Sequence, residues 1–495
     1  MSSNITSLRQ ALDCIRNDPK QYVETDVEAD PYLEIAGVYK KVGAGGTIMR
    51  PTKINGPAMM FNKIKGYPGA RVVIGITGSL KRLGLFVDTP PDQLAHKLNS
   101  CADKPIPPVF VQSDKALCQQ VVHKADDPDF DIRKILPVAT TCSADPAPAI
   151  TMGLARAEDL ETGESDVTMH RIFVQDVKDE ITLFAASELR HIGRMIRKAE
   201  KMNVPLPITI SIGVDPAIYL CTSFTPPVTP FGFDELSVAG ALRGQPVELA
   251  KCLTVNGAGI ANAEYVLEGE VIPGKKVNED KLTGTGYGLA EFAGYSGGAQ
   301  PAYVIKIKAV THRIDPIYQT CIAPSEELVN MMGVPMAASI LNITGKSLPG
   351  RVKNVYTHSS GGGRFMVVMQ ISKESPSHEG VQRQAALAAF SANPELKHII
   401  LVDDDVDIFD ISDVLWAMNT RYQCNIDTVF IPGVFGHPAD PSGYPYFSPY
   451  SRGHGVTCKA FFDCTVPFEL KEKFKRPVFK DVDVEKFLPG YDLSN

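Results

Sequence analysis

The sequence predicts an α+β protein with two unlike parts, because the spacing of its apolar residues changes along the chain. From about residue 130 to 310, short apolar runs recur between glycines, prolines and aspartates, which is typical of an antiparallel barrel or sandwich. After about residue 330, strand-like runs alternate with helix-like segments, which is typical of a small α/β domain. A chain of 495 residues is also too long for one compact core.

The elements of the first part are short. Residues 6–17 have helical spacing, and the runs GPAMMF and ARVVIGITG predict a hairpin or a pair of strands around the turn at residues 66–69. Farther along, one predicted helix at 190–202 interrupts the β-like runs of the barrel. These runs are ITMGLA, VTMHRIFVQ, ITLFA, PITISIGV, VELAKCLTV, AEYVLEGEVI and AYVIKIKAVTHR.

In the second part, a helix is expected over residues 326–345, followed by the strands VKNVYTH and FMVVMQIS and a helix near 379–392. The run HIILVDDDVDIFD resembles an acidic metal motif. We favour a buried strand whose terminal acids cap the next helix, DISDVLWAMNTR. From about residue 466 the chain is charged and contains several prolines, which predicts a helix or an arm that reaches a neighbour.

The amino-acid composition limits the kinds of partner that the protein is expected to bind. The net charge of -7 gives no electrostatic support for binding nucleic acid. No apolar run approaches the roughly 20 residues that span a bilayer, and the first residues lack the apolar core of a signal peptide. None of the ten cysteines forms a CxxC pair, so we expect reduced thiols in a cytoplasmic protein without a membrane partner.

Three polar clusters could carry chemistry. Strand alternation places Asp166 and His170 on one face of SDVTMHR, and a small bend would let Arg171 converge on the same ligand. His191 begins a predicted helix, where backbone N–H groups favour phosphate, and Glu235 lies between turns and an apolar segment. Two carboxylates and an imidazole suit Mn²⁺ or Mg²⁺. Spacing alone equally allows an ordinary surface strand, a surface histidine and a helix-capping acid.

Two glycine-rich segments are further candidates. The loop GTGYGLAEFAGYSGG contains Glu291 and predicts either a mobile lid that carries a general acid or a disordered surface loop. The segment Gly361-Gly362-Gly363-Arg364 resembles a phosphate cradle. No Lys-Ser/Thr pair follows it, so we expect a strand entry or a turn near a substrate.

The chain resembles the UbiD family of decarboxylases over nearly its whole length. The motifs GPAMMFNKIKGYPGARVVIG, SDVTMHR, ELRHIG, DELSVAGALRGQPVELAKC, AEYVLEGEVIPG, EFAGY and HIILVDDDVDIFDISDVLWAMNTR occur in the family's order. The resemblance is strongest to the protocatechuate and gallate decarboxylase branch, which shares ETDVE, GAGGT, RPT, GPAMMFN, SDVTxHR, RHI, GHP and DCTVPF.

This resemblance implies three parts. They are a flavin domain with a split β-barrel at residues 1–325, a linking helix at 326–345, and a C-terminal α/β association domain with its tail at 346–495. The implied cofactors are prenylated FMN and Mn²⁺ or Mg²⁺, with K⁺ as a possible addition. The implied partners are a small aromatic acid, carbon dioxide, a flavin prenyltransferase that supplies the cofactor, and further copies of the chain in a homodimer or homohexamer.

The resemblance also assigns site residues. It places the metal ligands at Asp166, His191 and Glu235. It places the cofactor contacts at these three residues and at Val167, Thr168, Met169, His170, Arg171 and Arg190. It places the substrate contacts at Phe292, Arg364 and His437, and a histidine at position 437 favours a hydroxyaryl acid because it can hydrogen-bond a phenol. A plain loop histidine is the alternative.

In the implied reaction, Arg171 pairs with the substrate carboxylate and Glu291 delivers a proton to the ring. The family's companion glutamate lies five residues before the proton donor, and this chain has Gly286 there, so an incomplete Glu–Arg–Glu network is expected. The alternatives are a decarboxylase of a heteroaromatic or other unsaturated acid, a carboxylase running in reverse, and a flavin-binding subunit without activity.

Overall fold

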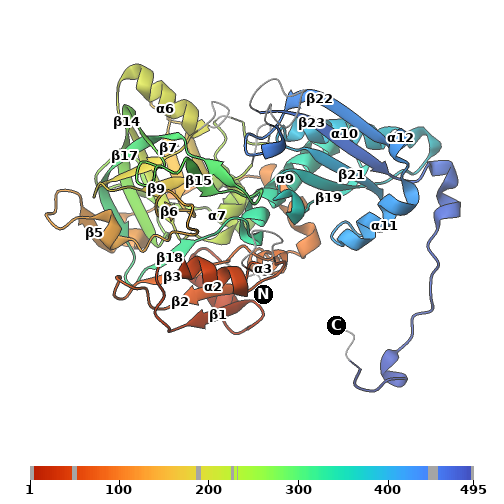
Figure 1. Cartoon of the computed structure of the whole chain (residues 1–495), viewed down its shortest axis with the longest axis horizontal. Coiled ribbons are helices and arrows are strands. Elements are labelled where there is room, and N and C mark those ends of the chain that lie inside the picture. The colour runs from red at the N-terminus through yellow and green to blue at the C-terminus, as the bar shows by residue number, and fades with distance from the viewer. Residues whose placement is uncertain are drawn as a thin grey trace.

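The structure is a computed structural model that describes residues 5–46, 53–185, 191–224, 228–230, 232–443 and 455–491. The described chain forms an N-terminal part, a central part built on a large sheet, and a C-terminal α/β part (Figure 1). A large antiparallel sheet with a separate α/β unit confirms the predicted α+β class.

The N-terminal part has a four-stranded sheet flanked by short helices. Its strands, in sheet order, are β1 Tyr22–Thr25, β2 Ala58–Phe61, β3 Arg71–Ile74 and β18 Ile317–Thr320. Its helices are α1 Leu8–Ile15, α2 Glu34–Val42, α3 Leu80–Phe86 and α4 Leu94–Ala102. β2 and β3 are antiparallel, as predicted, whereas β18 arrives from far along the chain and pairs in parallel with β3.

The central sheet contains nine strands whose pairings are all antiparallel. Its main path runs β6-β9-β10-β17-β14-β11-β7-β8, and β5 pairs with β17. The bounds are β5 Val121–Lys124, β6 Ala149–Ile150, β7 Leu154–Glu158, β8 Ser165–Met169, β9 Ile172–Val174, β10 Glu180–Leu183, β11 Leu206–Ile212, β14 Tyr265–Asn278 and β17 Pro301–His312. The sheet therefore covers the region where the sequence predicts a barrel or sandwich.

Smaller elements surround this sheet. They are α5 Ile132–Ile135, α6 His191–Met202, α7 Pro216–Cys221, α8 Glu235–Arg243, β4 Val109–Phe110, β12 Glu248–Lys251, β13 Ala258–Ile260, β15 Tyr287–Ala290 and β16 Ser296–Gly298. The run VELAKCLTV differs from prediction, because β12 pairs with β13 and β4 in a separate sheet. β15 and β16 form a hairpin.

Helix α9, Glu326–Ser347, lies between the central sheet and the C-terminal part (Figure 1). It contains 22 residues and is apolar enough to cross a membrane, but 83% of its apolar window is buried inside the protein. It packs against α4, α10 and β19. It therefore has the surroundings of a core helix that joins the parts of the chain.

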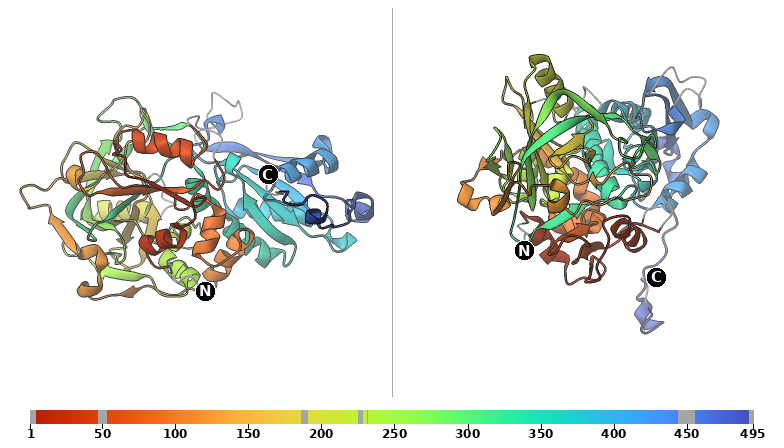
Figure 2. Two further views of the ribbon diagram at one scale, coloured as in Figure 1. Left: turned by 90° about the horizontal axis from the view of Figure 1, so that it is seen from below. Right: turned by 60° about the vertical axis from the view of Figure 1, so that its left-hand side comes forward.

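The C-terminal part has a five-stranded sheet in the order β19-β20-β21-β23-β22. Its elements are β19 Val352–Thr357, β20 Met366–Ile371, α10 Val381–Ala392, β21 His398–Asp403, α11 Ile411–Arg421, α12 Cys424–Asp427, β22 Thr428–Phe435 and β23 Val456–Cys464. β20, β21 and β23 are parallel. After about residue 475 the chain runs away from the body of the protein (Figures 1 and 2).

Candidate active site

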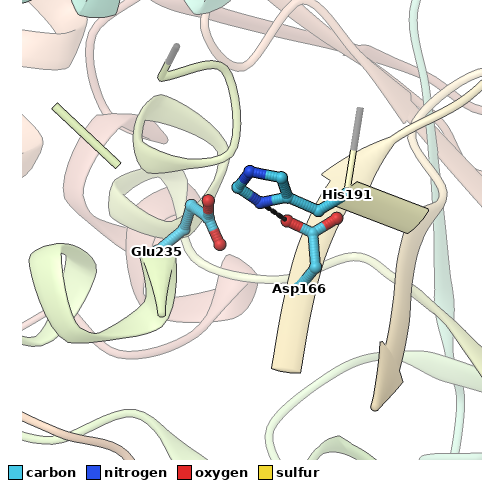
Figure 3. Close-up of side chains that lie close together, drawn as sticks. All are labelled: Asp166, His191 and Glu235. Carbon is cyan, nitrogen blue, oxygen red and sulfur yellow. Dashed lines mark hydrogen bonds and ion pairs between the residues drawn. The ribbon is translucent and has the colours of Figure 1, made fainter. Parts of the chain in front are cut away.

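Three side chains that are distant in the sequence meet beside the central sheet (Figure 3). Asp166 lies on β8, His191 is the first residue of α6, and Glu235 is the first residue of α8. One ligand atom of each lies within 4.8 Å of the others, and Nδ1 of His191 is 3.1 Å from Oδ1 of Asp166. The structure thus brings together the three residues that the sequence analysis names as metal ligands.

The two carboxylates of this cluster are buried and close together. Oδ2 of Asp166 and Oε2 of Glu235 have no hydrogen-bond partner among the described residues. Burial, and then the charge of Asp166, raise the pKa of Glu235 well above its ordinary value. A divalent cation would satisfy both oxygens and stabilise both charges, so the cluster fits Mn²⁺ or Mg²⁺.

Two of these three residues, His191 and Glu235, are positioned by the first turns of helices. Asp234, and not Glu235, is the N-cap of α8, because its side chain accepts the backbone N–H of Leu236. Because Asp234 caps the helix, the side chain of Glu235 can turn toward Asp166 and His191. His191 opens the 12-residue helix α6, whose first backbone N–H groups favour an anion. A cation site beside such a helix start suits a phosphate group.

Arg171 lies between two glutamates. Its Nε and Nη2 donate to the two carboxylate oxygens of Glu279 at 2.7 and 2.6 Å, and its Nη1 donates to Oε1 of Glu291 at 2.9 Å. The expectation of an incomplete network around Gly286 is therefore wrong, because Glu279, at the end of β14, supplies the second carboxylate. Burial raises the pKa of Glu279, and Arg171 opposes that shift. The sequence analysis missed Glu279, because an acidic residue after a predicted strand is too common a feature to indicate a functional site.

The hairpin of β15 and β16 presents Glu291 to Arg171. The backbone N–H of Glu291 donates to the carbonyl oxygen of Tyr295 at 2.8 Å and closes the turn. Glycines make room, since a Cβ at Gly288 would lie 3.2 Å from Nη1 of Arg171, and one at Gly297 would lie 3.1 Å from it. The glycine-rich loop is therefore an ordered hairpin packed against Arg171, not a disordered surface loop.

The other predicted cofactor residues have different surroundings. The side chain of Val167 is fully buried in the apolar core, so only its backbone is available to a ligand. Thr168 donates its hydroxyl to the carbonyl oxygen of Thr222 at 3.4 Å, and Met169 packs against the same core. His170 lies 3.2 Å from the carbonyl oxygen of Phe184 through Nδ1. Arg190 lies outside the described residues.

The three predicted substrate residues meet in one aromatic cluster. The ring of Phe292, next to Glu291, lies edge-on to His437 and to Phe365, with both centroid distances at 5.1 Å. The Arg364 guanidinium is 5.8 Å from the Phe292 centroid and forms an ion pair with Glu395. Phe365 and Glu395 were missed, because nothing in the sequence relates them to residues of the central part.

The acidic run at residues 402–410 is structural. Asp403 ends β21, and both it and Asp405 form ion pairs with Arg421. Asp410, the last acid of the run, caps α11. The expected cap is therefore present, but the acids at the end of the strand do not provide it. The glycine-rich segment before Arg364 is a turn that leads into β20, as expected.

Comparisons with known proteins agree with this architecture. Three family profiles match: the 3-octaprenyl-4-hydroxybenzoate carboxy-lyase N-terminal domain at residues 16–102, its Rift-related domain at 109–326, and its C-terminal domain at 329–464. Together they define a carboxy-lyase. The chain belongs to the UbiD family.

Relatives in this family are similar over nearly the whole chain. A gallate decarboxylase of Lactiplantibacillus plantarum is 47% identical over 99% of this chain and 100% of its own. A 3,4-dihydroxybenzoic acid decarboxylase of Enterobacter cloacae, solved as the apo protein, has 48% identity and a TM-score of 0.92 over 98% of this chain and 99% of its own. The UbiD-class enzyme HmfF of Pelotomaculum thermopropionicum, solved with FMN, has 32% identity and a TM-score of 0.85 over 97% and 100%. An evolved dimeric form of HmfF was solved with prFMN.

Proposed function

We propose that this decarboxylase uses prenylated FMN to remove carbon dioxide from a hydroxylated aromatic acid such as protocatechuate, gallate or 4-hydroxybenzoate. The observation that carries the proposal is the position of Arg171 between Glu279 and Glu291, five residues after Asp166 of the metal cluster. The similarity to decarboxylases of gallate and of 3,4-dihydroxybenzoic acid supports the substrate class.

Asp166, His191 and Glu235 would hold Mn²⁺ or Mg²⁺, which with the start of α6 would bind the flavin phosphate. The unsatisfied carboxylate oxygens of the cluster support this role, as do the flavin complexes of HmfF. When bound, the prenylated flavin supplies the electron sink that an aryl carboxylate lacks. A flavin prenyltransferase would supply the cofactor.

Arg171 binds and orients the substrate carboxylate. The paired hydrogen bonds to Glu279 fix the plane of the guanidinium, so its remaining N–H groups keep one direction. When the carbon–carbon bond breaks, carbon dioxide leaves and the ring carbon requires a proton. Protonated Glu291 delivers this proton, and Arg171 stabilises the resulting carboxylate at 2.9 Å. Solvent then protonates Glu291 again.

The aromatic cluster would contact the substrate ring. Phe292 follows the proton donor directly and lies edge-on to His437. Arg364 and His437 supply polar groups at the same place, which suits a ring that carries hydroxyl groups. The cluster joins the central and C-terminal parts, so a substrate bound there would be covered from both sides.

An anaerobic assay with protocatechuate and gallate tests this function. The protein is coexpressed with a flavin prenyltransferase and supplied with Mn²⁺, and protein that carries plain FMN is the control. We expect catechol and pyrogallol only with the prenylated cofactor. Glu291→Gln removes the proton donor but keeps its shape, so turnover should fall at least about 100-fold.

Other outcomes would change this conclusion. A bound prenylated flavin without turnover of either acid would exclude the hydroxybenzoate class and favour heteroaromatic acids. Protein that binds no flavin at all would contradict the cofactor, and full turnover by Glu291→Gln would remove the proton donor. The pairing of Arg171 with both glutamates argues against an inactive flavin-binding subunit.

We also propose that the chain associates as a homodimer or homohexamer. The extended C-terminal segment supports this proposal, because it carries apolar side chains that the rest of the chain leaves uncovered. Val478 and Phe479 are 95% and 86% exposed, and Phe487 is 65% exposed. Contact with a second copy would remove this apolar surface from water.

A further inference from the structure

The three residues of the metal cluster come from β8 and from helices that cover its two faces. Val167 of β8 packs in the same apolar cluster as Leu236 of α8. Ala157, which pairs with Asp166 across the sheet, packs in a different apolar cluster together with Ile192 of α6. Because neighbouring residues of a strand point to opposite faces, α8 covers one face of β8 and α6 covers the other.

Glu235 therefore approaches the cluster past the edge of the sheet. β8 is the last strand in the sheet order, and the carboxylate of Glu235 points toward Asp166 and His191 (Figure 3). This approach depends on how α8 is rotated about its own axis, since a small rotation would carry the carboxylate away. Apolar packing holds two elements together but has no direction. A directional contact between β8 and α8 is needed to fix this rotation.

One hydrogen bond provides such a contact, and it joins the residues directly before the two carboxylate ligands. Ser165 stands before Asp166 on β8, and its Oγ donates to Oδ2 of Asp234 at 3.1 Å. Asp234 stands before Glu235, and its Oδ1 accepts the backbone N–H of Leu236 at 2.8 Å. Asp234 is therefore fixed to α8 through one oxygen and to β8 through the other. We call the contact between β8 and α8 the Ser165–Asp234 bridge.

Helix capping alone does not account for this bridge. Asp410 caps α11 in the same way, by accepting the backbone N–H of Ser412 at 2.9 Å. Within the part of the chain that the structure describes, its side chain contacts no neighbouring strand through a hydrogen bond. Asp234 makes the equivalent capping contact and adds a second hydrogen bond, which reaches the strand that carries Asp166.

The bridge opposes the repulsion between the two ligands. Asp166 and Glu235 are both buried, and among the described residues Oδ2 of the first and Oε2 of the second have no hydrogen-bond partner. Carboxylates that bind a metal are ionised, so these two repel each other until a cation lies between them. A site that already has its binding geometry loses less free energy to rearrangement when the cation arrives.

We propose that the Ser165–Asp234 bridge sets the direction of Glu235 and thereby raises the affinity of the cluster for a divalent cation. Ser165 and Asp234 are positioning residues, because each acts through the ligand that follows it in the chain. This inference rests on the metal site of the proposed function and deepens it. Residues that orient metal ligands typically change metal affinity by about 10- to 100-fold.

Titration of the FMN-loaded protein with Mn²⁺ tests the bridge. The EPR signal of unbound Mn²⁺ gives the Kd without substrate or turnover. Ser165→Ala removes the bridge and leaves the cap of α8 in place, so we expect the Kd to rise about 10-fold or more. Ser165→Thr keeps a hydroxyl group and should bind Mn²⁺ within about 3-fold of the wild type.

A double-mutant cycle separates the bridge from the charge of Asp234. Asp234→Ser keeps a good cap for α8 but has no second oxygen for Ser165. Ser165→Ala should therefore raise the Kd about 10-fold in the wild-type background and less than about 2-fold in the Asp234→Ser background. The matched control is Asp410→Ser, which makes the same substitution at the cap of α11 and should leave the Kd unchanged.

A second pair of variants allows for poor folding of Ser165→Ala. Ser165→Thr and Ser165→Val have nearly the same shape and differ in the hydroxyl group. We expect Ser165→Val to bind Mn²⁺ about 10-fold more weakly than Ser165→Thr at similar melting temperatures.

Two results would overturn the inference: equal Kd values for Ser165→Thr and Ser165→Val, and an equal effect of Ser165→Ala in both backgrounds of the cycle. A wild type that binds no Mn²⁺ would overturn the metal site together with the inference. Failure to turn over protocatechuate and gallate would contradict the proposed substrates alone, because the titration requires neither acid.

Discussion

At Arg171, one guanidinium is shared by two carboxylates of different exposure. The side chain of Glu279 is fully buried, whereas that of Glu291 is 27% exposed. The buried partner holds Arg171 in place, and the more open partner can exchange protons with solvent. The two glutamates would therefore have different roles: Glu279 would position Arg171, and Glu291 would transfer the proton.

Glu279→Gln should lower kcat without unfolding the protein. The amide keeps the shape but loses one charged acceptor, so Arg171 is held less firmly. We expect turnover to fall about 10- to 100-fold, because hydrogen bonds between charged groups contribute about 1.5–3 kcal/mol. Steady-state kinetics and thermal melting measure both effects.

Glu180→Gln is a suitable control, since it removes an ion pair with Lys275 on the neighbouring surface. Its kinetics should match those of the wild type. Equal activity of Glu279→Gln and the wild type would show that Glu279 does not orient Arg171.

At the scale of single elements, the first turn of α9 joins the N-terminal part to the rest of the chain. Glu327 is completely buried there, and its carboxylate accepts the backbone N–H groups of Gly75 and Thr77 at 2.8 and 3.2 Å. Burial raises its pKa to about 7. The contact between helix and sheet therefore depends on the protonation of one side chain.

This pKa predicts how stability changes with pH. Between about pH 4.5 and 7 the folded protein keeps the proton on Glu327 while the unfolded chain releases it, so the contribution of this group to stability falls as pH rises. The whole effect is up to about 3 kcal/mol. Glu327→Gln removes the titration, so its melting temperature should rise relative to that of the wild type as pH increases through this window. A difference in melting temperature between the two proteins that stays constant across these pH values would contradict the prediction.

The elements also show what periodicity can and cannot predict. The amphipathic faces of α1 and α6, the antiparallel character of the central sheet and the α/β alternation of the C-terminal part are local patterns, and the sequence predicted them. The meeting of Asp166, His191 and Glu235 depends on tertiary packing, and only the family resemblance suggested it. Glu279 and Glu395 had no local signal, because their arginine partners lie 108 and 31 positions away in the sequence.

Across the whole molecule, the central and C-terminal parts touch where a glycine turn meets the Glu291 hairpin. A Cβ at Gly362 would lie 2.5 Å from Cδ2 of Phe292 and 2.9 Å from its carbonyl oxygen. Gly362 also has a φ of +64°, which favours glycine. The closeness of this contact sets how near the C-terminal part comes to the hairpin that carries Glu291, the proposed proton donor.

In Gly362→Ala, the added methyl group should push the glycine turn away from Phe292. We expect a fall in kcat/KM of about 10-fold or more, because misplacing catalytic groups by about 1 Å is costly. Gly350→Ala is the matched control: its φ is +74° and nothing lies within 4 Å of the added Cβ, so it carries similar backbone strain without the clash. An equal fall in kcat/KM for the two variants would mean that backbone strain, and not the contact with Phe292, lowers activity. No fall in either variant would mean that the contact does not control activity.

The pairing of β18 with β3 has a consequence for synthesis on the ribosome. The N-terminal sheet acquires its last strand only when residues 317–320 emerge, although β3 ends at Ile74. At about 5–20 residues per second, this strand follows β3 by roughly ten seconds to a minute. During that interval the outer edge of β3 has exposed backbone groups, and it becomes protected only after nearly two thirds of the chain has been translated.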